Sequence, residues 1–158
     1  MVEDLRKAIE ATNHLDNKLA IVSSPDDATL AALYRECRFT LYLSYYEGWG
    51  LPVSDSLSFG KICVASERTS IPEAGSRFCL YVDPDNTTAA YETVKNLISS
   101  PNMLEQLEGE LRDNYTPTSW TTTADAIVQT LLPEAESMKA RAEFDPSPGC
   151  ALAAFRRA

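Results

Sequence analysis

Four short apolar runs recur along this chain, and the segments between them have the character of helices. The runs cover residues 18–22, 39–43, 62–65 and 79–82, and their apolar side chains occupy consecutive positions instead of alternate ones. A strand of that kind is buried on both of its faces, as it is in a parallel sheet. The alternation therefore predicts an α/β fold in which helices cover a parallel sheet on both faces.

Helices are predicted between and after these runs from the spacing of apolar residues and from capping residues. Pro52 suits the first turn of one helix, and Gly60 suits its end. The predicted helices cover residues 3–13, 26–37, 52–60, 87–99, 104–114 and 120–132. Beyond the last of them the composition shifts to Glu, Ala, Ser, Pro and Arg without periodicity. We therefore predict one domain over residues 1–132 and a mobile tail over residues 133–158, in which 134–142 can form a short helix.

The charge balance and the cysteine pattern argue against several classes of partner. The chain has 14 Lys and Arg against 23 Asp and Glu, a net charge of −9. This acidity argues against binding to nucleic acid or to an anionic membrane, since both need clustered basic residues. Because no apolar run could span a bilayer and the N-terminus lacks a secretory signal pattern, we expect a cytoplasmic protein without a transmembrane segment. The four scattered cysteines lack metal-ligand spacing and predict reduced thiols instead of a metal site.

The stretch at residues 44–55 is the part of the sequence that indicates chemistry. It joins a predicted strand to a predicted helix, at the edge of a parallel sheet where open α/β folds bind ligands. Gly48 and Gly50 allow the backbone to approach a ligand closely and to adopt positive φ. The start of the helix leaves the N–H groups of Gly50, Leu51 and Val53 free and presents the positive end of the helix dipole. These features are typical of a phosphate-binding turn, although a tight turn without a ligand has the same residues.

Two carboxylates flank this turn. Glu47 precedes it, and Asp55 follows eight residues later, within the predicted first turn of the helix. An acid in a first turn stabilises a helix by itself, through the helix dipole. Beside a phosphate site, an acid also fits the hydroxyl groups of a ribose. Both interpretations of Asp55 stay open on the residues alone.

The run Glu-Gly-Trp-Gly-Leu-Pro-Val-Ser-Asp at residues 47–55 resembles the Glu-x7-Glu motif of the retaining GT-B glycosyltransferases of group 1. Flanking segments that are also similar to this family cover residues 27–34, 59–66, 70–73 and 82–84. The resemblance extends over residues 3–132 in the order that the family has. It implies a Rossmann-like sheet and a match to the C-terminal, donor-binding domain of a two-domain glycosyltransferase.

The resemblance also implies a role for each residue of the motif. Glu47 would hold the donor sugar during a transfer with retention, and Asp55 would hold the ribose hydroxyls. Backbone N–H groups would face the diphosphate of a UDP-sugar or GDP-sugar donor. The implied donor-binding set is Gly48, Trp49, Gly50, Leu51 and Asp55, with Val22 and Ser23 near the base. The resemblance implies no metal ion and no other cofactor.

The chain departs from the family in three respects. Asp55 stands where the family usually has Glu, which is one methylene longer. Two strands that carry an Arg and a Lys for the diphosphate are not found, and neither is the N-terminal acceptor domain. We therefore expect a truncated fragment that is inactive alone, in which Arg68 and Arg77 are candidates for replacing the basic pair. The alternatives are a truncated, non-catalytic module that binds a nucleotide or a partner and, less favoured, a sugar-nucleotide epimerase of similar architecture.

Overall fold

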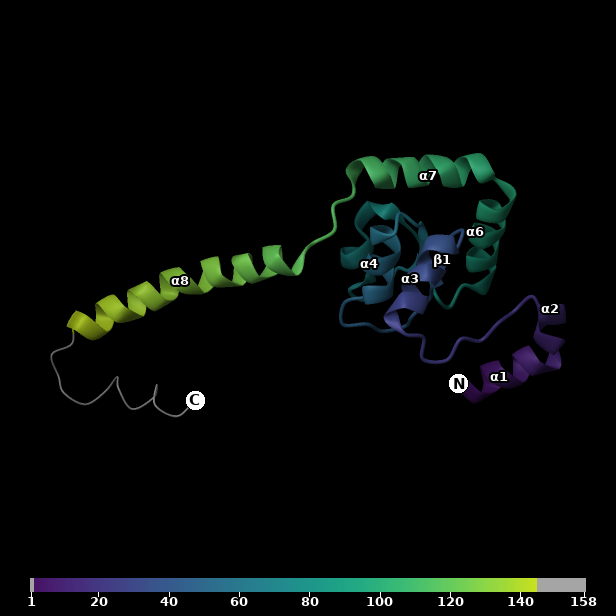
Figure 1. The fold of residues 1–158 in the computed structure, drawn as a ribbon, viewed down its shortest axis with the longest axis horizontal. Helices are drawn as coiled ribbons and strands as arrows, with labels where there is room; N and C mark the ends of the chain where they lie inside the picture. Colours follow the sequence, from purple (N-terminus) through teal and green to yellow (C-terminus); the bar gives the residue numbers. More distant parts are fainter. Residues whose placement is uncertain (1, 145–158) are drawn as a thin grey trace. The chain divides into compact units, whose positions relative to one another are not determined.

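The structure, a computed structural model, describes residues 2–144 (Figure 1). The chain divides into two compact units, Met1–Tyr115 and Thr116–Ala158. The first unit holds the sheet, whose strands are β1 (Thr40–Tyr42), β2 (Cys63–Ser66) and β3 (Cys79–Val82). Its helices are α1 (Val2–Ala11), α2 (Asn13–Asn17), α3 (Asp27–Glu36), α4 (Leu51–Ser58), α5 (Ile71–Gly75), the 3-10 turn η1 (Ser76–Phe78), α6 (Thr87–Ser99) and α7 (Pro101–Asn114).

The regular secondary structure described in the second unit is the helix α8 (Trp120–Phe144). It continues through the boundary that the sequence predicts between residues 132 and 133, so one helix stands where two are predicted. Residues 145–158 of the predicted tail lie outside the described residues. The division into a domain over 1–132 and a mobile tail over 133–158 therefore stays a prediction. No helix within residues 2–144 is both long enough and apolar enough to cross a membrane.

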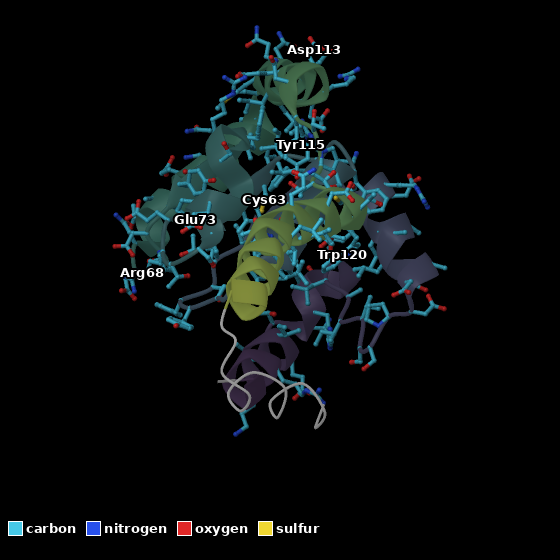
Figure 2. The ribbon with its side chains drawn as sticks, turned by 90° about the vertical axis from the view of Figure 1, so that its left-hand side faces the viewer. Cys63, Arg68, Glu73, Asp113, Tyr115 and Trp120 are labelled. Carbon is cyan, nitrogen blue, oxygen red and sulfur yellow. The ribbon has the colours of Figure 1, made fainter. Side chains whose placement is uncertain are left out.

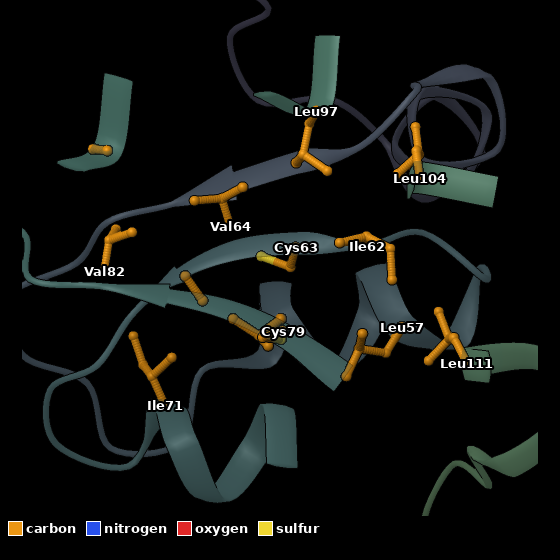
Figure 3. Packing of buried hydrophobic residues seen from close by; sticks show 13 residues of the cluster. Leu57, Ile62, Cys63, Val64, Ile71, Cys79, Val82, Leu97, Leu104 and Leu111 are labelled. Carbon is orange, nitrogen blue, oxygen red and sulfur yellow. The ribbon is translucent and has the colours of Figure 1, made fainter. Parts of the chain in front are cut away.

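The three strands form one parallel sheet in the order β1-β2-β3. Thr40 lies opposite Cys63, and Cys63 lies opposite Cys79, so the strands start at nearly the same level. Figure 3 shows Leu97 of α6 on one side of the sheet and Ile71 of α5 on the other. Helices on both faces of a parallel sheet confirm the predicted Rossmann-like α/β class.

The core lies between this sheet and its helices. All four residues of β2 are buried, and the first three of them belong to the consecutive apolar run at 62–65. From the helices, Leu57 of α4 and Leu97 of α6 are almost fully buried. The buried hydroxyl of Ser56 has partners, because it donates to the carbonyl of Lys61 and lies 2.7 Å from the Thr40 hydroxyl.

The helix ends follow the capping residues of the sequence. The carboxylate of Asp26 accepts the N–H of Thr29 at the start of α3, as predicted. Gly60 has φ of 71° just after α4. The N–H of Gly60 bonds the carbonyl of Leu57, and the N–H of Lys61 bonds that of Ser56. This pair of bonds is a Schellman motif, and it confirms Gly60 as the end of the helix.

The predicted strand at residues 18–22 does not form. This segment has no regular secondary structure, and Ile21 and Val22 are half exposed. Within the described residues β1 pairs only with β2, so its other edge is open. An apolar run becomes a strand only where a neighbour accepts its backbone hydrogen bonds. The prediction was wrong because it inferred a strand from composition without a neighbour to pair with.

Candidate functional site

The loop between β1 and α4 follows the carboxyl end of β1, where the sequence predicts a ligand site. Within residues 2–144, the backbone N–H groups of Gly48, Trp49, Gly50 and Leu51 donate no hydrogen bond. Val53 differs from the prediction, because its N–H donates to the carbonyl of Gly50 at 3.0 Å. The free N–H groups therefore lie at and just before the first residue of α4. There they join the positive end of the helix dipole, an arrangement that attracts anions.

Gly50 determines how the chain enters α4. It is the N-cap residue and has φ of 101° and ψ of 52°, a left-handed conformation that strains any residue with a side chain. A Cβ there would lie 3.5 Å from Ile71, an ordinary contact distance, so the constraint is conformational. Gly48 does not have the positive φ that the sequence allowed for, and a Cβ there would meet nothing within 4 Å.

This difference between the two glycines gives a matched pair of variants. Gly50→Ala is expected to reduce the free energy of unfolding by about 1–2 kcal/mol, because alanine must adopt the left-handed region. Gly48→Ala, with the same chemical change, is expected to change it by less than about 0.5 kcal/mol. Urea denaturation followed by circular dichroism measures both. Equal losses in the two variants would contradict the role assigned to the backbone of Gly50.

Glu47 is held by both its side chain and its backbone. The hydroxyls of Tyr42 and Ser44 donate to the same carboxylate oxygen, Oε1, at 2.5 and 2.7 Å. The N–H of Glu47 donates to the Thr69 hydroxyl at 3.2 Å, and its carbonyl accepts the Ser70 hydroxyl at 3.0 Å. The loop after β1 is thus tied to the loop after β2 at this residue. The second carboxylate oxygen, Oε2, has no hydrogen-bond partner within residues 2–144.

These hydrogen bonds also set the protonation states. The Tyr42 and Ser44 hydroxyls lower the pKa of the Glu47 carboxyl, because they stabilise its ionised form. The bond to Glu47 raises the pKa of Tyr42 to about 12, since ionising the phenol would remove the donor. At neutral pH the pair therefore consists of a carboxylate and a neutral phenol that donates to it.

Asp55 lies on the second turn of α4. The helix begins at Leu51, one residue before Pro52, because Gly50 serves as its N-cap. The predicted position of Asp55 in the first turn was therefore wrong. Because the helix dipole stabilises acids mainly in the first turn, the position of Asp55 does not favour a purely helix-stabilising role. Its carboxylate forms no hydrogen bond or ion pair within the described residues. It is partly exposed and has no structural partner among them.

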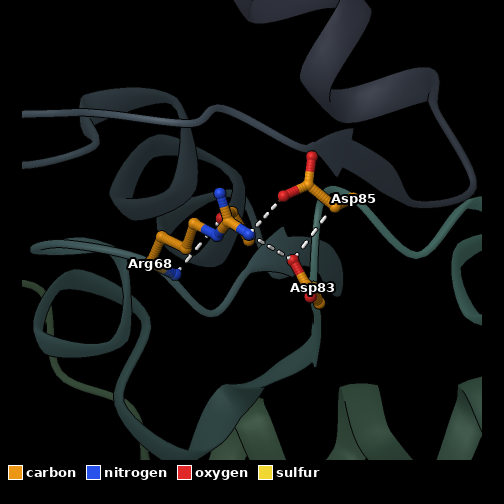
Figure 4. A network of polar contacts seen from close by, with 4 residues as sticks. Arg68, Asp83 and Asp85 are labelled. Atoms are coloured by element: carbon orange, nitrogen blue, oxygen red, sulfur yellow. Dashed lines mark hydrogen bonds and ion pairs between the residues drawn. The ribbon is translucent and has the colours of Figure 1, made fainter.

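The two candidate replacement arginines are already paired with acids. The Nη2 atom of Arg68 lies 2.8 Å from Oδ1 of Asp83 and 2.5 Å from Oδ2 of Asp85 (Figure 4). Its guanidinium also lies 5.6 Å from the ring centre of Tyr45, close enough for a cation–π contact. Arg77 pairs with Glu110 on α7 at 3.6 Å. The arrangement favours a structural role for Arg68, which joins the loops that follow β2 and β3.

The Arg68 cluster gives a pH-dependent prediction. The hydrogen bond from Arg68 lowers the pKa of the Asp85 carboxyl below its ordinary value. The ion pair therefore stabilises the folded protein fully above the pKa of an aspartate in the unfolded chain, about 3.9. This stabilisation is lost as the pH falls through the lower pKa that Asp85 has in the folded protein. At about pH 6 the free energy of unfolding is expected to be larger for the wild type than for Arg68→Gln. Below about pH 4 the difference between the two free energies of unfolding is expected to shrink. Denaturant titrations across this range measure it, and a difference that grows on acidification would contradict the assignment.

Other predicted site residues lie outside this hydrogen-bonded group. Val22 and Ser23 are exposed, and within residues 2–144 neither bonds to the loop before α4. Their contact with a base stays a prediction. No cluster of three or more His, Cys, Asp or Glu side chains suited to a metal ion occurs among the residues that the structure describes. Whether the site works without a metal also stays a prediction.

Sequence reasoning placed Ser44 at the start of the stretch that indicates chemistry, but it assigned no role in the site to Ser44 or to Tyr42. A weak signal was present, because these two hydroxyl-bearing residues lie only five and three residues before Glu47, at the end of the predicted strand and just after it. The Thr69 and Ser70 contacts had no such signal. They lie 22 and 23 residues from Glu47, and only the alignment of parallel strands brings them to it.

The sheet, its covering helices and the anion-attracting edge define a Rossmann-like α/β domain. Comparison with known families then gives a finer assignment. Residues 1–113 match the family described as glycosyl transferases group 1, and this chain belongs to that family. The match confirms the group 1 resemblance that the Glu47-to-Asp55 motif indicated.

Several similar proteins are mannosyltransferases. O-antigen chain mannosyltransferase B of Escherichia coli is 40% identical over 63 residues, which are 40% of this chain and 16% of that protein. The GDP-mannose:cellobiosyl-diphosphopolyprenol alpha-mannosyltransferase of Komagataeibacter xylinus is 27% identical over 151 residues, 89% of this chain and 38% of that protein. The protein of the same name from Xanthomonas campestris is 33% identical over 106 residues, 63% of this chain and 26% of that protein. The chain thus spans well under half the length of these relatives.

Proposed function

We propose that this domain binds GDP-mannose and serves as the donor-binding part of a mannosyltransferase that retains the anomeric configuration. The observation that carries the proposal is the group of free N–H donors at Gly48, Trp49, Gly50 and Leu51, next to the fixed carboxylate of Glu47. The names of the relatives support a GDP-mannose donor over a UDP-sugar. Retention is supported by the resemblance of the motif to retaining enzymes.

Each part of the site has a role in this proposal. The free N–H groups and the helix dipole bind the diphosphate, and during transfer they stabilise the charge that develops on the leaving β-phosphate. The unpartnered Oε2 of Glu47 accepts a hydroxyl of the mannose. The Asp55 carboxylate accepts the ribose hydroxyls, and Val22 and Ser23 contact the base. No metal ion or other cofactor enters this scheme.

A second candidate function is nucleotide binding without catalysis. One observation favours it, which is that the two arginines expected to replace the family's basic pair are paired with acids, Arg68 with Asp83 and Asp85 and Arg77 with Glu110. A charge-assisted contact to phosphate contributes roughly 1.5–3 kcal/mol, so the loss of two such contacts weakens donor binding by a few powers of ten. In this version the domain is a truncated module that binds a nucleotide or a partner protein and transfers no sugar.

The acceptor belongs to a further domain in the first proposal. The lengths of the relatives support this further domain, because the chain matches at most 38% of the length of any of the three relatives described above. On this account, residues 2–144 alone bind the donor but do not complete the transfer.

We also propose that the domain is located in the cytoplasm. Free thiols at Cys37, Cys63 and Cys79 support a reducing compartment.

Calorimetric titration with GDP-mannose, GDP and UDP tests the proposal. We expect GDP-mannose and GDP to bind more tightly than UDP. Asp55→Ala is expected to weaken the affinity for both guanine nucleotides by about tenfold or more, because the ribose loses a charged acceptor. Asp113→Ala is the matched control, since Asp113 is an exposed acid on α7, well away from Arg68 in Figure 2. If neither nucleotide binds, the donor proposal is wrong, and binding without transfer in a complete enzyme would favour the second candidate.

A further inference from the structure

The hydroxyl of Tyr42 occupies a particular place in the candidate site. It donates to Oε1 of Glu47 at 2.5 Å, within the range of a charge-assisted O–H···O⁻ bond. The Ser44 hydroxyl donates to the same oxygen at 2.7 Å. Two donors on one oxygen fix the plane of the carboxylate, while the other oxygen keeps its lone pairs for a further donor.

The surroundings prevent Glu47 from leaving this position easily. Its N–H and carbonyl are bonded to Thr69 and Ser70, so the backbone is held from the loop after β2. A glutamate side chain that rotates freely loses rotamer entropy when it becomes ordered. In this protein the Glu47 side chain is already ordered before a ligand binds. The entropy cost of ordering it therefore does not reduce the affinity for the ligand.

Tyr42 is itself well anchored. It is the last residue of β1, and its backbone pairs with Ala65 of the buried strand β2. Its ring packs against the hydrophobic core, and only the hydroxyl has a polar contact with the loop. Because the ring and the hydroxyl have separate roles, Tyr42→Phe removes the bond to Glu47 and keeps the packing.

We propose that Tyr42 is a positioning residue for sugar transfer, which with Ser44 holds Oε1 of Glu47 so that Oε2 accepts a hydroxyl of the donor sugar. This inference rests on the proposed function, in which Glu47 contacts the sugar and not the diphosphate. It predicts that loss of the Tyr42 hydroxyl affects binding of the sugar-bearing donor selectively.

The test compares wild-type protein with Tyr42→Phe and with Tyr91→Phe, an exposed tyrosine on α6 that serves as the matched control. Carbon-13 NMR of the glutamate carboxyl groups measures the pKa of Glu47 without ligand, and calorimetry measures GDP-mannose and GDP affinities. We expect Tyr42→Phe to raise the pKa of Glu47 and to weaken GDP-mannose binding about three- to tenfold, with GDP binding unchanged. The control variant should match wild type in all three measurements.

The possible failures are distinguishable. If Tyr42→Phe leaves the pKa of Glu47 unchanged, or weakens GDP and GDP-mannose equally, the positioning role is wrong. If it moves the pKa but both affinities stay at the wild-type value, the hydrogen bond exists without the positioning effect, and the inference also fails. If the wild type binds neither nucleotide, both the proposed function and a role toward the donor sugar are overturned, while the pKa measurement still decides whether the hydrogen bond forms.

Discussion

Glu47→Ala is expected to weaken GDP-mannose binding by about 10- to 100-fold and to leave GDP binding unchanged. The reason is that an ionised carboxylate bonded to a sugar hydroxyl contributes roughly 1.5–3 kcal/mol, and GDP has no sugar at that position. Calorimetric titration of both ligands measures the effect. In a complete enzyme the same change is expected to abolish transfer, because the carboxylate is lost from the reacting sugar.

Two further variants separate binding from folding. Glu47→Gln keeps an acceptor for the Tyr42 and Ser44 hydroxyls, so it should retain wild-type stability and show a smaller loss of GDP-mannose affinity. Glu105→Ala removes an exposed glutamate from α7 and should change neither ligand's affinity. Wild-type affinity for GDP-mannose in Glu47→Ala would exclude this side chain from the donor site. Loss of affinity in Glu105→Ala as well would show that the effect arises from net charge.

Leu57→Ala is expected to reduce the free energy of unfolding by about 2–5 kcal/mol, which is a large share of the stability of a small domain. Leu57 is only 2% exposed and lies on the face of α4 that packs under the sheet (Figure 3). Its removal leaves a cavity beneath the helix that presents the free N–H groups. Urea denaturation measures the loss.

Leu51→Ala is the matched control for this change. Leu51 belongs to the same helix but is 61% exposed, so its truncation should cost less than about 0.5 kcal/mol. Similar stability losses for the two leucines would contradict the packing described for α4.

The parts of the fold that the sequence predicts well are those with local signals. The helix α6 covers Thr87–Ser99, as predicted, because Asn86 caps it and its apolar residues have helical spacing. The strand β3 ends at Val82, where Asp83 and Pro84 stop the apolar run. Both features depend on neighbours in the chain, which a sequence displays directly.

The errors arose where a distant partner decides the structure. Residues 18–22 have a strand-like composition but no neighbouring strand, so they do not pair. The pairing of Arg68 with Asp83 and Asp85 spans 15 and 17 residues and depends on where β2 and β3 end together. In the site, the turn at Gly50 was predictable from glycine before a helix, whereas the hydrogen bonds that fix Glu47 were not.

The most direct test of the account follows the backbone amides themselves. Nitrogen-15 NMR of the labelled chain, titrated with GDP-mannose, reports on each N–H group separately. We predict that the largest amide shifts occur at Gly48, Trp49, Gly50 and Leu51, and that GDP produces the same pattern, because the diphosphate is common to both ligands. Saturable binding that leaves these four amides unmoved, or no binding at all, would contradict the claim that they hold a sugar nucleotide's diphosphate.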